Sequence, residues 1–123
     1  MNSWFLAAGA TSSAIALLHF FGGGPAIAGP LLAAKDIDDV AKYLNYYCWH
    51  IVTICLALMA ASFVWSGLAA TAWEAAFLGT IMAFAFCIWG IALVIIKQQR
   101  FRAMPQGWLF LPVAALGLVG FAV

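Results

Sequence analysis

The sequence contains very few charged residues. Only 7% of its 123 residues are Asp, Glu, Lys or Arg, whereas soluble domains carry about 25%. A chain with so few polar side chains cannot cover a globular surface with groups that bind water. Its net charge of +1 also provides no basic stripe that would displace counterions from a nucleic acid. These deficits exclude nucleic acid as a partner and indicate that the lipid bilayer surrounds most of the chain.

The sequence also lacks the patterns of a disulfide framework, a metal site or a catalytic site. Its three cysteines, Cys48, Cys55 and Cys87, lie within apolar runs and form no CxxC pair, so we predict that they pack as small hydrophobic side chains. Cys48 and His50 would point to different faces of a helix, so four metal ligands do not converge. No GxSxG motif or other nucleophile with a nearby base occurs, and no catalytic residue is predicted.

Apolar residues are abundant, at 67% of the chain with a mean hydropathy of +1.09. They form four runs, at about residues 3–21, 43–65, 75–96 and 108–123, and helices of about these lengths can cross a bilayer. We therefore predict an all-α integral membrane protein, a four-helix transmembrane bundle that forms a single membrane domain over residues 1–123. The last run is the shortest and would have to stand nearly upright or thin the bilayer locally.

A polar segment separates the first two runs. Gly22-Gly23-Gly24-Pro25 is predicted to end the first helix, because glycine accepts a left-handed cap and proline cannot continue the helix. The pattern over about residues 31–42 then predicts a short amphipathic helix in the membrane interface, with a solvated loop containing a helical turn as the alternative. This segment also carries two i,i+4 pairs of opposite charge, Lys35–Asp39 and Asp38–Lys42.

Every basic residue follows either the first or the third run: Lys35, Lys42, Lys97, Arg100 and Arg102. In a four-span protein these two connections lie on the same side of the membrane, and basic residues favour the cytoplasmic side. We therefore expect both termini on the non-cytoplasmic side. The same asymmetry opposes removal of the first run as a signal peptide, although Ala26-Ile27-Ala28 resembles a cleavage site.

Small residues recur four apart in three of the runs. Such rows let helix backbones approach closely in lipid, where no hydrophobic effect drives the helices together. They predict packing within the bundle, against a second copy or within a larger membrane complex. The rows are Ala10 and Ala14, Ala57 and Ala61, and Ala75, Gly79 and Ala83.

The two histidines stand near the same predicted membrane face. His19 lies near the end of the first run and His50 near the start of the second, and helices joined in this way are normally antiparallel neighbours. Polar residues within a span are costly and are often functional. We therefore predict a binding pocket for a ligand or cofactor that contains His19, His50, Ser12, Tyr46, Tyr47 and Thr53.

Three interpretations of these histidines remain open at this point. The two imidazoles could be the axial ligands of a haem iron, which would be the only metal in the protein. They could hydrogen-bond a quinone or a lipid headgroup. Alternatively, each histidine could bond a backbone carbonyl or reach toward the headgroups, where it costs little.

Two classes of function follow from these patterns. The first is an accessory or assembly subunit, or scaffold, that packs through its helices. The second is a membrane protein that binds a lipid-soluble ligand near His19 and His50. Small four-helix drug exporters are similar in length and number of spans, but they depend on a glutamate within the first helix. The first run here has no acidic residue, so transport is the least favoured function.

Several short motifs resemble a group of small, uncharacterised four-span proteins of the bacterial inner membrane. These motifs are His19 at the end of the first span, a Gly-rich bend with Pro30-Leu31-Leu32, Trp49-His50 at the start of the second span, and Arg102 with Pro105-Gln106-Gly107 before the last. The resemblance implies a multi-pass, all-helical protein in the inner (cytoplasmic) membrane of a bacterium. It assigns no chemistry to any residue.

Overall fold

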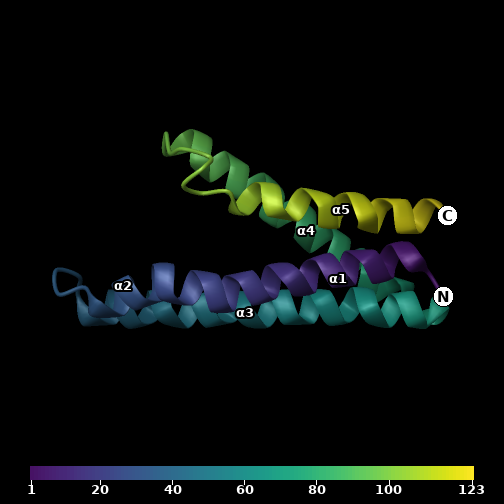
Figure 1. The fold of residues 1–123 in the computed structure, drawn as a ribbon, viewed down its shortest axis with the longest axis horizontal. Helices are drawn as coiled ribbons and strands as arrows, with labels where there is room; N and C mark the ends of the chain where they lie inside the picture. The colour runs from purple at the N-terminus through teal and green to yellow at the C-terminus, as the bar shows by residue number, and fades with distance from the viewer.

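The computed structural model describes residues 1–123, and all of its regular secondary structure is helical (Figure 1). The first three helices follow one another without a break and form one rod. A short turn then leads to the longest helix, and the last two helices form a second hairpin. In chain order the helices are α1 (Ser3–Leu17), the π-helix η1 (Leu18–Ala28), α2 (Gly29–Ala33), α3 (Asp39–Leu68), the 3-10 helix η2 (Ala70–Ala72), α4 (Trp73–Ile96) and α5 (Gln106–Ala122). The all-α prediction is therefore confirmed.

Three helical stretches are long and apolar enough to cross a membrane: Ser3–Ala33, Asp39–Leu68 and Ala70–Ile96. The fourth apolar helix, α5, has 17 residues. At 1.5 Å per residue α3 is about 45 Å long and α5 about 26 Å, against a hydrocarbon core of about 30 Å. The first hairpin therefore reaches farther from the termini than the second, as Figure 1 shows at the turn between α2 and α3.

The predicted end of the first helix at Phe21 is wrong, because the chain stays helical through Gly22–Pro25. Pro25 has no N–H and its ring crowds the carbonyl four residues earlier, which disfavours an α-helical turn at this point. The segment instead takes the wider π-helical form, and the Gly29 N–H bonds to the Gly24 carbonyl five residues earlier. The change of helix type thus keeps backbone hydrogen bonds within the rod instead of leaving a break.

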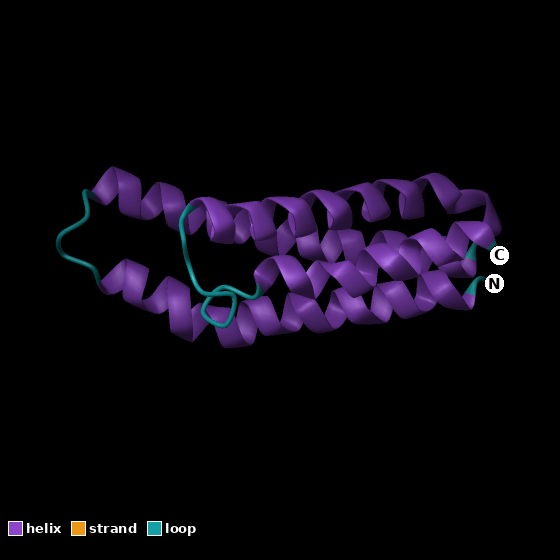
Figure 2. Cartoon of the chain, turned by 90° about the horizontal axis from the view of Figure 1, so that it is seen from above, coloured by secondary structure: helices purple, strands orange, loops and turns teal.

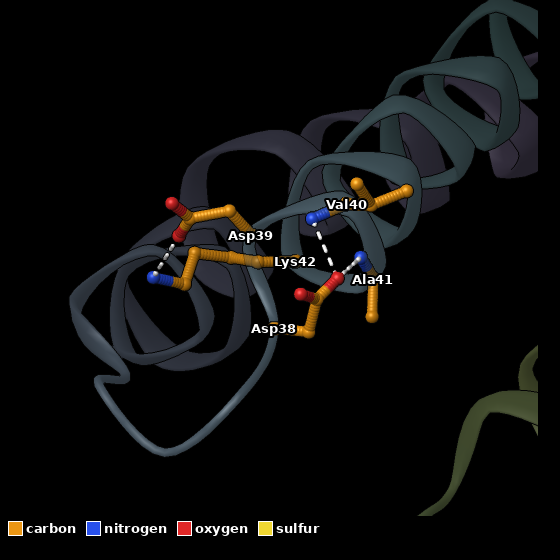
Figure 3. Close-up of polar contacts among 5 residues, drawn as sticks. All are labelled: Asp38, Asp39, Val40, Ala41 and Lys42. Atoms are coloured by element: carbon orange, nitrogen blue, oxygen red, sulfur yellow. Dashed lines mark hydrogen bonds and ion pairs between the residues drawn. The ribbon is translucent and has the colours of Figure 1, made fainter.

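The predicted helix over residues 31–42 is also wrong, because the turn from Ala34 to Asp38 divides it between α2 and α3. Asp38 caps α3, with its carboxylate accepting hydrogen bonds from the Val40 and Ala41 N–H groups at 2.9 and 3.3 Å (Figure 3). Such caps satisfy N–H groups that have no partner within the helix. Lys42 pairs with Asp39 at 3.3 Å, so neither predicted i,i+4 pair forms.

The helices pack as two hairpins, the rod with α3 and α4 with α5. Both termini lie at one end of the molecule (Figures 1 and 2), and the two hairpins meet there and diverge toward the opposite end (Figure 1). Asn2 links α3 and α5 at this end by hydrogen bonds. Its backbone N–H donates to the Gly67 carbonyl at 2.8 Å and its side-chain amide donates to the Gly120 carbonyl at 2.8 Å.

The apolar core occupies the half of the molecule nearest the termini. Phe5, Phe63 and Val113 are among its buried members, and they come from α1, α3 and α5. On α3 no residue between Tyr43 and Cys55 is buried. The half of the first hairpin that carries the two histidines is therefore held by its own two helices, outside the main core.

Candidate functional site

Trp49, on α3, is the residue that contacts His19. The imidazole of His19 stacks on the Trp49 indole with ring centroids 3.9 Å apart and planes inclined by 20°. His19 Nε2 also lies 3.3 Å from the Trp49 carbonyl oxygen, so the tautomer protonated at Nε2 donates a hydrogen bond to it. Both interactions fix His19 against α3.

Gly23 provides the space for the Trp49 ring. A Cβ atom at Gly23 would lie 2.7 Å from Trp49 Cη2 and 3.1 Å from Cζ2, closer than van der Waals contact allows. His19 and Gly23 are four residues apart, and one indole lies against both. The glycine is therefore required at this position by the close approach of the two helices.

Two further predicted residues lie beside Trp49. Thr53 Oγ1 donates to the Trp49 carbonyl at 3.1 Å, as a threonine one helical turn later can do. Tyr46 and His50 form an edge-to-face pair with ring centroids 4.6 Å apart. The structure thus brings His19, Thr53, Tyr46 and His50 to one level through Trp49 and its neighbours on α3.

The other two predicted residues lie elsewhere. Tyr47 is 62% exposed. Ser12 is fully buried two helical turns before His19, within the core-forming half of α1, and its hydroxyl has no hydrogen-bond partner. That all six residues bind a ligand stays a prediction, but only four of them share one location.

A groove lies between the rod and α3 at this level, with a volume of about 230 Å³. The rod contributes Phe20, Gly24, Ala28, Gly29 and Leu32 to it, and α3 contributes Tyr46, Trp49 and His50. The π-helical turns of η1 supply most of one wall. Such turns are rare and are often found at functional sites.

The geometry does not fit a haem held by both histidines. One face of the His19 ring is covered by Trp49, and its Nε2 is taken up by a backbone carbonyl. The groove is also too small for a haem, since it is smaller even than the roughly 300–1,000 Å³ of pockets that enclose drug-sized ligands. No three His, Cys, Asp or Glu side chains come together as a metal-binding group.

The predicted set of site residues did not contain Trp49, Gly23 or Gly24. The spacing of His19 and Gly23, together with that of Tyr46, Trp49, His50 and Thr53, places each set on one helical face, and this signal was available in the sequence.

Comparisons with known proteins give no match: no protein-family model, no curated protein and no solved structure is similar to this chain.

Proposed function

We propose that this chain is a four-span protein of the bacterial inner membrane that serves as an accessory or assembly subunit, packing through its first hairpin against another membrane protein. In this proposal both termini lie on the non-cytoplasmic side. The resemblance of its motifs to small four-span bacterial proteins supports this location.

The distribution of charge and tryptophan supports the orientation. All five basic residues lie in or next to the two connections on the side away from the termini, as expected for a cytoplasmic face. Trp65 and Trp73 are exposed near the terminal end, and Trp89 is exposed toward the other. Trp73 and Trp89 are separated by about 24 Å along α4, a spacing suited to the two edges of a bilayer.

The observation that carries the functional proposal is a patch of four exposed alanines on the outer face of the first hairpin. They are Ala10 and Ala14 of α1, and Ala57 and Ala61 of α3. Gly9 packs against Ala60 and Val64, so the two antiparallel helices place Ala10 beside Ala61 and Ala14 beside Ala57. We name these four residues the alanine patch.

The alanine patch faces away from the second hairpin. At 100° per residue, Ala57 and Ala61 lie on the opposite side of α3 from Met59 and Phe63, and Phe63 packs on Gly79 of α4. Gly79 and Ala83, the equivalent small residues of α4, are buried inside the bundle. The chain therefore uses one small-residue row for its own packing and leaves two open, side by side, where a further helix can approach closely.

The test is to enlarge the alanine patch and measure the mass of the native assembly in mild detergent. Ala14→Ile and Ala61→Ile should release the chain from a larger complex, because a bulky side chain prevents close helix approach. Ala85→Ile, at an exposed alanine of α4, is the matched control and should leave the complex intact. The proposal fails if the chain migrates alone in every case, or if the patch variants assemble like the control.

A further inference from the structure

We propose that the groove between η1 and α3 binds the headgroup of a lipid-soluble quinone, with Tyr46 and His50 as the hydrogen-bond donors to its carbonyl oxygens. This site is separate from the alanine patch. An accessory role does not require it, and the two proposals can fail independently.

The first argument is that both donors are unused within the chain. Tyr46 and His50 contact each other edge to face, and the side chain of neither forms a hydrogen bond in the protein. A second groove, of about 300 Å³ at the terminal end, differs in this respect. Its Asn2 amide donates to Gly120 and its Ser66 hydroxyl donates to Ala72, which leaves the Trp73 indole as its one side-chain donor without a hydrogen bond.

The second argument is that the groove has no charged lining residue. The nearest lysine on the same face of α3 is Lys42, one turn before Tyr46, and it pairs with Asp39. A phospholipid phosphate would need a cation to replace its hydration. Neutral carbonyl oxygens need only neutral donors, so a quinone suits this lining better than a phospholipid headgroup does.

The third argument is shape. Aromatic side chains of Phe20, Tyr46 and Trp49 line the groove together with small residues of η1 and α2. Its 230 Å³ correspond to about eight water molecules at roughly 30 Å³ each, close to a single substituted ring. A Cβ built at Gly24, a lining residue, meets nothing within 4 Å, so this glycine leaves open the space in which a flat ring would lie.

The fourth argument is that the groove lies where a quinone ring can reach it from the membrane. His50 lies on α3 about 27 Å from the terminal end of that helix, near the far edge of a hydrocarbon core about 30 Å thick. Phe20 and Leu32 at the groove are exposed on the surface of the hairpin. A quinone ring can therefore enter from the membrane while its isoprenoid tail stays among the lipid chains.

The experiment measures binding of decylubiquinone to the purified full-length chain in phospholipid nanodiscs. The wild-type chain should bind it saturably, at about one molecule per chain. Gly24→Leu fills the open space and should weaken binding more than tenfold. Gly22→Leu is the control, since Gly22 lies outside the groove and its Cβ meets only the flexible end of Leu18, and it should bind like the wild type. Circular dichroism and size-exclusion profiles verify that each variant is folded.

Tyr46→Phe keeps the shape of the groove and removes one donor. It should weaken binding about three- to tenfold, the usual worth of one hydrogen bond, so it tests the proposal even if Gly24→Leu does not fold. The proposal is overturned if decylubiquinone only partitions without saturation, if Gly22→Leu weakens binding as much as Gly24→Leu, or if Tyr46→Phe binds unchanged. Saturable retention of phospholipid in the groove, found by mass spectrometry in place of quinone, would also overturn it.

Discussion

Replacing each of two adjacent glycines by alanine should change stability in opposite directions. Neither glycine has a positive φ, so alanine can adopt both backbone conformations, and it gains about 0.5–1 kcal/mol by restricting the unfolded chain. At Gly24 the new methyl group meets nothing within 4 Å, so this gain should appear in full. At Gly23 the methyl group would lie 2.7 Å from the Trp49 ring, and such overpacking costs about 1–3 kcal/mol.

Gly24→Ala should therefore be more stable than the wild type, and Gly23→Ala should be less stable. The free energies of unfolding of the two variants should differ by about 1–3 kcal/mol. The Trp49 ring cannot move aside freely because His19 is stacked on it. In a His19→Ala background the penalty at Gly23 should accordingly shrink, which a double-mutant cycle measures. The assay is thermal denaturation in detergent followed by circular dichroism. A Gly23→Ala chain as stable as Gly24→Ala would refute the described contact between Trp49 and η1.

Three further substitutions test other parts of the fold by the same assay. Gly107→Ala should lower stability by about 1–3 kcal/mol or more, because its Cβ would lie 2.6 Å from the Ile91 backbone nitrogen; a neutral result would contradict the close packing of α4 and α5. Gln98 has a φ of +52°, so Gln98→Gly should raise stability by about 1 kcal/mol; a loss of stability would contradict that backbone conformation. Ser12→Ala should be neutral or stabilising because its buried hydroxyl has no partner, whereas Ser66→Ala loses the bond to Ala72 and should cost about 1–3 kcal/mol.

The helical architecture could be predicted because apolar runs in so uncharged a chain have few alternatives. The predicted end of α4 at Ile96 agrees with the structure, and its start differs by two residues. The path after Phe21 could not be predicted from local signals. Glycine and proline commonly end helices, but η1 keeps its backbone hydrogen bonds by changing to the wider helix type, which no local sequence signal reports.

Only the level of the candidate site along the first hairpin could be predicted from the sequence. The positions of His19 and His50 in the sequence indicated a common level, and contacts through Trp49 agree with it. The partner of His19 depended on the rotamer that Trp49 adopts and on the absence of a Cβ atom at Gly23. The periodicity of the sequence reports neither of these. Whether Tyr46 or Tyr47 lines the groove depended on the direction that this part of α3 faces, which is set by its packing against the rod.

The most direct test of this account is the side of the membrane from which each end of the bundle can be labelled. Single cysteines are introduced into a cysteine-free chain at Asp36, at Gln99 and just before Met1, and intact cells are treated with a membrane-impermeant maleimide. The account predicts labelling only at the N-terminal cysteine, with Asp36→Cys and Gln99→Cys labelled after the membrane is opened. Labelling of Asp36→Cys and Gln99→Cys on opposite sides of the membrane would contradict it.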